Sequence, residues 1–153
     1  MPGAPAAGTG GELLVIGANH RTSPLAWRDR FTLMEAELAD ELDRLRGKGF
    51  REAVLIVTCD RIELVSTVEA EPLRARFAEH LAGRLGETVE RVTAALYHHR
   101  GVAALRHLFA VASALDSLVI GEPQVLGQLR AAHRVASEAG LVSGTLEAAF
   151  QAA

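Results

Sequence analysis

The architecture of this chain follows from Ala53-Val-Leu-Ile-Val-Thr-Cys-Asp-Arg-Ile-Glu-Leu-Val-Ser-Thr-Val68. Two runs within it, 53–58 and 62–68, are rich in β-branched and apolar residues, and such runs predict β-strands. Only three residues separate them, a length that suits the turn of a hairpin between antiparallel strands. The stretch therefore predicts an antiparallel sheet with a cysteine at one of its turns.

The segments on either side extend this pattern. Short apolar runs predict two further strands, at 13–17 and 93–98, and recurrent leucines predict helices at 32–46 and 72–85. The first of these helices opens with the Thr-x-x-Glu spacing of a capping box. The order strand, helix, strand, strand, helix, strand predicts an α+β fold with a ferredoxin-like antiparallel sheet (βαββαβ).

Beyond residue 100 the pattern becomes helical. Residues 102–120 are apolar on nearly every face, which a helix tolerates only when it is packed on all sides. Further helices are predicted at 123–138 and 145–153. We therefore expect a flexible tail at 1–12, one domain at 13–140 and the start of a linker helix at 141–153.

Composition narrows the class of protein. The 153 residues suffice for one domain, and 49% hydrophobic with 23% charged residues is the balance of a globular protein. A net charge of −3 gives no general attraction to a polyanion, so any RNA contact must be local. The single cysteine excludes an intramolecular disulfide and a cysteine-based zinc cluster. With no membrane-spanning apolar run and no secretory signal at 1–11, we expect a cytoplasmic protein.

Cys59 is the first candidate for chemistry. A lone cysteine is most often a small buried hydrophobe, but this one stands in a predicted turn, where a side chain can meet a ligand. Arg61 would favour the reactive thiolate, whereas the carboxylate of Asp60 would disfavour it. From these residues alone a nucleophile and a structural cysteine both stay open.

The histidines and the polar segment after residue 120 supply further candidates. His98 and His99 do not predict a metal site, because neighbours in a strand point to opposite faces and nothing nearby completes the ligands. Burying the imidazole of His107 in an apolar helix costs free energy unless it has a hydrogen-bond partner. His107 is therefore either a hydrogen-bonded core histidine or a proton donor or acceptor beside a polar stripe. That stripe consists of Arg106, Ser113, Asp116 and Ser117. Glu122 and Gln124 could cap a helix or hydrogen-bond a small polar ligand.

With these residues in view, the chain resembles the N-terminal catalytic domain of glutamyl-tRNA reductases from about residue 13 to residue 153. Four blocks carry the resemblance, in the family's order and spacing: Asn19-His-Arg-Thr-Ser-Pro24, Thr58-Cys-Asp-Arg-Ile-Glu63, Ala114-Leu-Asp-Ser117 and Gly121-Glu-Pro-Gln-Val-Leu-Gly-Gln128. The second block is similar to the family's nucleophile turn. A match to any one block is weak support for the resemblance, whereas matches to all four in the family's order and spacing are specific.

The resemblance implies a mechanism. Cys59 would attack the ester of glutamyl-tRNA and form a glutamyl thioester, which NADPH would reduce to glutamate-1-semialdehyde for tetrapyrrole synthesis. His107 matches the family's functional histidine, and Arg61 would pair with the side-chain carboxylate of the substrate. The full glutamate pocket would be lined by Thr58, Asp60, Arg61, Ser117, Glu122, Pro123, Gln124 and Gln128.

The resemblance also implies partners beyond this chain. No Gly-x-Gly-x-x-Gly follows a predicted strand, so NADPH would be bound by a separate domain, and no metal is expected. A dimerisation domain would make the full-length protein a homodimer. The product would pass to glutamate-1-semialdehyde aminomutase.

Two departures from the family keep an alternative open. The family's Asn after the cysteine is Asp60 here, and the Gly before Leu115 is Ala114. Asp60 would slow acyl transfer by disfavouring the thiolate and competing for Arg61. The chain could therefore be a divergent, non-catalytic module that binds glutamate or a tRNA end. A generic ferredoxin-like regulatory domain would require the four-block match to be accidental.

Overall fold

The computed structural model describes residues 11–68, 73–113 and 123–153, with the backbone alone for Val68, Pro123 and Gln124. Its four strands are β1 (Glu12–Asn19), β2 (Val54–Val57), β3 (Arg61–Val68) and β4 (Tyr97–Arg100). They form one sheet in the order β2-β3-β1-β4, and every neighbouring pair is antiparallel. The α+β class and the antiparallel sheet expected from the sequence are confirmed, and β2 and β3 are the predicted hairpin.

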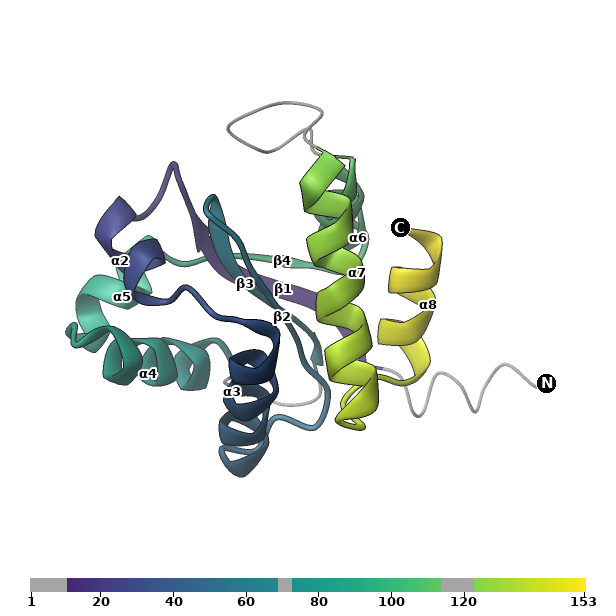
Figure 1. Cartoon of the computed structure of the whole chain (residues 1–153), viewed down its shortest axis with the longest axis horizontal. Helices are drawn as coiled ribbons and strands as arrows, with labels where there is room; N and C mark the ends of the chain where they lie inside the picture. Colours follow the sequence, from purple (N-terminus) through teal and green to yellow (C-terminus); the bar gives the residue numbers. More distant parts are fainter. Residues whose placement is uncertain (1–10, 69–72, 114–122) are drawn as a thin grey trace.

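Helices cover the sheet in two groups (Figure 1). The first group consists of α2 (Leu25–Arg30), α3 (Glu35–Gly47), α4 (Leu73–Leu85) and α5 (Val89–Ala95). The second group consists of α6 (Val102–Ala112), α7 (Pro123–Glu138) and α8 (Gly144–Ala152). α6 contacts β1 and β4, α7 contacts β2, and α8 contacts β1 and β3, so the second group carries residues from the end of the chain onto the sheet.

The core between these layers is mostly aliphatic. Leu42 and Leu45 of α3, Phe77 of α4, Leu64 of β3 and Leu146 of α8 have no measurable exposure. Burying a side chain of this size stabilises the fold by roughly 1.5–3 kcal/mol. The last helix is therefore anchored in the same core as the sheet. Among the described residues, no helix is long and apolar enough to cross a membrane.

Two predicted elements need correction. The capping box expected at Thr32 is displaced, because α3 begins at Glu35 and the Met34 backbone N–H donates to the carboxylate of Glu37 at 2.9 Å. The strand expected at 93–98 was wrong in its bounds, because the Thr88 hydroxyl accepts from the Arg91 N–H and starts helix α5. The chain becomes extended only at Tyr97.

The helical part agrees more closely with the predicted pattern. α7 has the predicted bounds, and α8 spans nearly the predicted segment. α6 ends at Ala112, with Ser113 as its C-cap, and the remainder of the helix expected to reach Ile120 lies outside the described residues. The short helix α2 was not predicted, because Pro24 and its polar neighbours favour a loop up to the residue where α2 begins.

Candidate active site

The turn between β2 and β3 presents Cys59. The backbone N–H of Thr58 donates to the Arg61 carbonyl at 3.0 Å, which closes the hairpin. The N–H of Asp60 donates to the Thr58 hydroxyl, also at 3.0 Å. Both flanking residues are buried, whereas Cys59 is exposed. The turn therefore holds its backbone fixed and leaves a free thiol accessible.

Arg28 of α2 fixes this turn from outside the hairpin. Its Nε donates to the Cys59 carbonyl at 3.0 Å, and its Nη1 donates to the Ser23 carbonyl at 2.9 Å. The Arg28 side chain is buried, so most of its surface is removed from water. Arg28 thus joins the loop after β1, the first block of the family resemblance, to the cysteine turn. No periodicity or motif in the sequence indicates this contact.

Asp60 lies beside the thiol. The Cys59 Sγ is 3.9 Å from the Asp60 Oδ1, within reach of a weak S–H···O hydrogen bond. Asp60 is buried, so its carboxylate is held in this position by the surrounding turn. Any chemistry at the Cys59 sulfur would therefore take place beside this carboxylate.

Behind the turn, three donors converge on one oxygen of Glu63. Arg61 Nη1 donates to Glu63 Oε2 at 3.3 Å, His107 Nε2 of α6 lies 2.5 Å from the same oxygen, and the Tyr97 hydroxyl of β4 donates to it as well. Arg61 and Glu63 are each 1% exposed. Burial alone would raise the pKa of the Glu63 carboxyl, but the hydrogen bond and charge of His107 and the charge of Arg61 hold that pKa below its ordinary value.

The His107 ring is packed against β4. It stacks on His99 with a centroid separation of 4.5 Å and lies 5.6 Å from the Tyr97 ring. Its side chain keeps 12% exposure, so it is neither sealed in the core nor free in solvent. Arg106 and Ser113 of the predicted stripe are exposed, while His107 turns to the sheet instead. Asp116 and Ser117 lie outside the described residues.

The structure brings together part of the predicted site. Thr58, Cys59, Asp60 and Arg61 share one turn, and Arg61 is linked to His107 through Glu63. Gln128 of α7 is exposed and borders a cavity of about 160 Å³ with Leu55 and Val57 of β2, the strand that leads to the turn. Ser117 and Glu122 lie outside the described residues. Pro123 and Gln124 begin α7, with the backbone alone described.

Sequence reasoning missed Glu63 and Tyr97 as members of the site. Glu63 stood inside the quoted nucleophile block, but nothing in the sequence paired it with His107, which is 44 residues away. Tyr97 is 34 residues from Glu63 and lies in the strand whose bounds were predicted wrongly. Both contacts depend on the sheet order.

The described residues do not fit a dinucleotide cofactor or a metal ion. A dinucleotide site of the Rossmann type needs parallel strands and a glycine-rich turn that opens a helix, whereas this sheet is antiparallel and β1 leads into the Asn19–Pro24 loop. Within the described ranges, no group of three or more His, Cys, Asp or Glu side chains could hold a metal ion.

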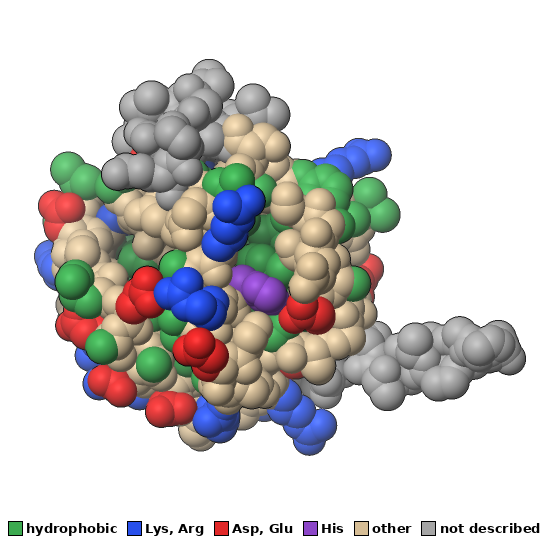
Figure 2. All heavy atoms as spheres, turned by 45° about the vertical axis from the view of Figure 1, so that its right-hand side comes forward, with side chains coloured by type: hydrophobic (Ala, Val, Ile, Leu, Met, Phe, Trp, Pro, Cys, Tyr) green, Lys and Arg blue, Asp and Glu red, His purple; other side chains and the backbone are tan. Residues whose placement is uncertain are grey.

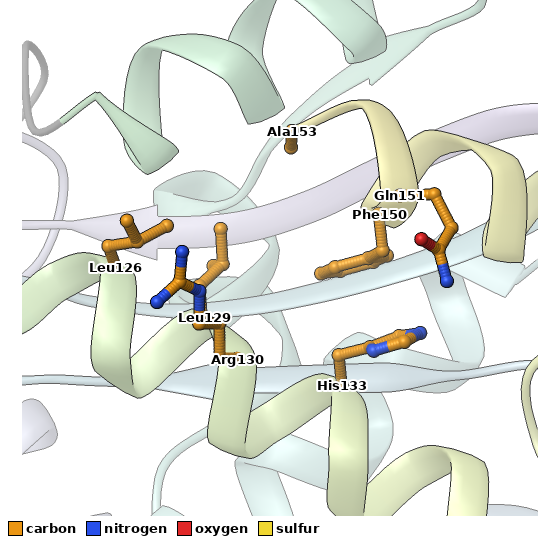
Figure 3. Close-up of a pocket in the computed structure, with 7 residues that line it drawn as sticks. All are labelled: Leu126, Leu129, Arg130, His133, Phe150, Gln151 and Ala153. Atoms are coloured by element: carbon orange, nitrogen blue, oxygen red, sulfur yellow. The ribbon is translucent and has the colours of Figure 1, made fainter.

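A second pocket lies between α7 and α8 and shares no residue with the predicted site. It has a volume of about 270 Å³ and is lined by Leu126, Leu129, Arg130, His133, Phe150, Gln151 and Ala153 (Figure 3). His133 stacks on Phe150 at 5.2 Å and lies 3.0 Å from the Glu147 carboxylate, which ties the two helices together. On the face that α7 and α8 share, Figure 2 shows a histidine among basic and acidic side chains.

Comparisons with known proteins agree on one family. Residues 16–153 match the family described as glutamyl-tRNAGlu reductase, N-terminal domain. The chain is 44% identical over 142 residues to a glutamyl-tRNA reductase of Alcanivorax borkumensis, covering 91% of this chain and 33% of that protein. It is 46% identical over 153 residues to one of Syntrophus aciditrophicus, covering 92% of this chain and 35% of that protein.

A solved structure shows the same fold. The glutamyl-tRNA reductase from Methanopyrus kandleri is similar with a TM-score of 0.67 and 24% sequence identity, over 91% of this chain and 31% of that chain. The chain thus spans about a third of the length of the curated relatives it matches.

Proposed function

Because this chain belongs to the glutamyl-tRNA reductase N-terminal domain family, we propose that it carries the acyl-transfer step on glutamyl-tRNA, with Cys59 as the nucleophile. The observation that carries the proposal is an exposed thiol on a rigid turn, two residues before an arginine that is bonded through Glu63 to a histidine. A nucleophile near a positioned proton donor or acceptor is the arrangement that covalent acyl transfer needs.

The step is balanced without any other reactant. The Cys59 thiolate attacks the ester carbonyl carbon, a C–S bond forms, and the C–O bond to the terminal ribose of the tRNA breaks. The departing ribose oxygen takes up the proton that the Cys59 thiol has given up, and His107 is the proposed carrier of that proton between the two groups. The products are deacylated tRNA and a glutamyl thioester on Cys59.

The substrate pocket is proposed from matching positions. Arg61 would bind the side-chain carboxylate of glutamate through its planar donors, and its contact with Glu63 holds the guanidinium behind the turn. The position of Gln128 next to β2 supports a contribution from α7. The remaining proposed lining residues are Thr58, Asp60, Ser117, Glu122, Pro123 and Gln124.

The rest of the reaction is assigned to other parts of the protein. We propose that hydride transfer from NADPH, giving glutamate-1-semialdehyde for tetrapyrrole synthesis, uses a domain that follows a linker helix beginning at 141–153. A homodimer and transfer of the product to glutamate-1-semialdehyde aminomutase belong to the same proposal. A thiol that must remain reduced supports a cytoplasmic location. The strand order β2-β3-β1-β4 supports the ferredoxin-like assignment.

The proposal is tested by deacylation of glutamyl-tRNA. The chain should release free tRNA, and Cys59→Ser should reduce that release to the uncatalysed rate, because the hydroxyl is a much weaker nucleophile than a thiolate. Arg130→Gln, which alters an exposed residue of the α7–α8 pocket, serves as the control and should leave the rate unchanged. Equal release by the chain and Cys59→Ser would contradict the proposal.

A second candidate is a binding module that retains the pocket without chemistry. The specific observation in its favour is the Asp60 carboxylate 3.9 Å from the thiol, where the family has an amide. In that case glutamyl-tRNA would bind to the chain with its ester intact. A filter-binding measurement beside the deacylation assay separates the two functions.

A further inference from the structure

The proposed chemistry gives Glu63 no task beyond its contact with Arg61, although two further donors meet the same carboxylate oxygen. The Glu63 Oε2 accepts hydrogen bonds from the Arg61 guanidinium of β3, the His107 ring of α6 and the Tyr97 hydroxyl of β4. A carboxylate that is 1% exposed is costly unless such donors surround it. Residues from β3, β4 and α6 therefore hold the Glu63 Oε2 in one position.

Gly17 provides the space that this position requires. Gly17 of β1 pairs with Glu63 of β3 on one side and with Tyr97 of β4 on the other, so the three residues form one row across the sheet. Paired residues in neighbouring strands direct their side chains to the same face. A Cβ on Gly17 would lie 2.5 Å from the Cγ of Glu63. The Glu63 side chain thus leans over the glycine toward Tyr97 and His107.

The contact with His107 has a chemical consequence for the ring. A carboxylate oxygen accepts hydrogen bonds and does not donate them, so the nitrogen 2.5 Å away must carry a proton. In the neutral imidazole that places the single proton on Nε2 and leaves Nδ1 as the basic nitrogen. His99 stacks on the ring and restrains its rotation.

We propose that Glu63 is a positioning residue that holds His107 as its Nε2–H tautomer, so that His107 exchanges protons with the reacting groups through Nδ1. Gly17 and Tyr97 set the position of the carboxylate. This inference rests on the acyl-transfer function proposed above, in which His107 moves the proton. It predicts a particular nitrogen as the active one, which a purely structural ion pair between Glu63 and Arg61 would not require.

The tautomer is measured directly by 15N NMR of the chain labelled at histidine, at a pH where His107 is neutral. The His107 signals are assigned by their loss in His107→Gln. A protonated Nε2 and an unprotonated Nδ1 are expected. A neutral ring protonated on Nδ1, or rapid exchange between the two tautomers, would overturn the inference, and this measurement does not depend on any enzymatic activity.

A double-mutant cycle tests whether Glu63 acts through His107. Glu63→Gln should slow thioester formation at least about tenfold, because a misplaced His107 loses part of the roughly 10²–10⁴-fold that a positioned proton-transfer group contributes. In a His107→Ala background the same change should cost less than about twofold, because the residue it positions is gone. Equal losses in both backgrounds would show that Glu63 acts on Arg61 or on stability alone.

Glu41→Gln is the matched control for removing a buried carboxylate. Glu41 has no exposure and also lies 2.5 Å from a histidine Nε2, that of His80, but it joins α3 to α4 instead of lying in the site. It should leave acyl transfer within about twofold. If the unaltered chain forms no thioester, the proposed function fails, while the NMR result still decides whether Glu63 fixes the tautomer.

Discussion

At the scale of single residues, the reactivity of Cys59 depends on which neighbours share its turn. Arg28 binds its carbonyl, which fixes the backbone and leaves the side chain exposed. The Asp60 carboxylate lies 3.9 Å from the thiol sulfur. A negative charge at this distance repels a second negative charge on the sulfur.

Replacing Asp60 with Asn should therefore make Cys59 more reactive. Two unit charges about 4 Å apart in water interact with about 1 kcal/mol, which corresponds to roughly a fivefold change in an equilibrium. We expect Asp60→Asn to raise the rate of alkylation of Cys59 by iodoacetamide at pH 7 by about two- to fivefold, and thioester formation in the same direction.

The control for net charge is Asp43→Asn on α3, where the side chain is 66% exposed. It should leave the alkylation rate unchanged. An unchanged or slower rate for Asp60→Asn would show that the carboxylate does not oppose the thiolate in this turn.

The sequence predicted the residues of the Cys59 turn but not the contacts behind it. Cys59, Asp60 and Arg61 are neighbours in the chain, so their placement in one turn followed from the strands on either side. The convergence of His107 and Tyr97 on Glu63 could not be predicted, because both partners reach it only after β1 and β4 have paired with their neighbours.

At the scale of elements, β1 is an interior strand, which pairs with β3 along one edge and with β4 along the other. Gly17 lies where β1 passes between Glu63 and Tyr97. A methyl group there would approach the Glu63 Cγ to 2.5 Å and the Ile62 carbonyl oxygen to 2.6 Å. The second of these atoms belongs to the backbone and cannot move without disturbing the sheet.

We expect Gly17→Ala to destabilise the fold by about 1–3 kcal/mol, the usual cost of overpacking a core. Gly83→Ala in α4 is the control, because nothing lies within 4 Å of its added Cβ. Alanine should stabilise that helix by up to about 1 kcal/mol. Urea unfolding measures both, and equal stabilities for Gly17→Ala and the unaltered chain would refute the close contact.

α3 and α4 are joined by a second buried carboxylate. His80 Nε2 is 2.5 Å from Glu41 Oε2, and Arg44 and Arg84 also pair with this side chain. Burial alone would raise the pKa of the Glu41 carboxyl, but the hydrogen bond and charge of His80 and the charge of Arg84 lower it below its ordinary value of 4.5. The folded chain therefore binds fewer protons here than the unfolded chain.

This difference predicts how stability depends on pH. The contribution of Glu41 is complete above its ordinary pKa and is lost as the pH falls through the lower pKa of the folded state. The free energy of unfolding should thus drop below about pH 4.5, and Glu41→Gln should make that drop shallower. Glu79→Gln, an exposed residue of α4, should leave the slope as it is. Urea titrations from pH 7 to pH 3 measure the slope, and identical slopes for all three chains would contradict the prediction.

The elements differ in how well local sequence predicted them. α7 was predicted to the residue, because its apolar positions recur at helical spacing between Pro123 and Gly140. The end of α5, residues 93–95, was predicted as the start of a strand, because Thr93 and its apolar neighbours favour extended structure unless the cap at Thr88 is recognised. Short helices such as α2 form mainly through tertiary packing, here of the buried Trp27 and Arg28.

At the scale of the whole molecule, the Cys59 turn, His107 and the helices α6, α7 and α8 are all placed by one sheet and its core. Leu146 anchors α8 beside the sheet, so the segment that ends the chain is part of the domain's packing. The chain spans about a third of its relatives. Under the proposed function the acyl transfer should proceed without NADPH, and the thioester should then be lost to water.

The most direct test of the acyl-transfer claim is the mass of the chain after reaction with glutamyl-tRNA. The mixture is quenched in acid within seconds, and the chain is digested and analysed by mass spectrometry. The proposed function predicts one glutamyl group on the peptide that contains Cys59, formed equally with and without NADPH and absent in Cys59→Ser. An unmodified Cys59 peptide at every time point, with tRNA bound and its ester intact, would contradict it.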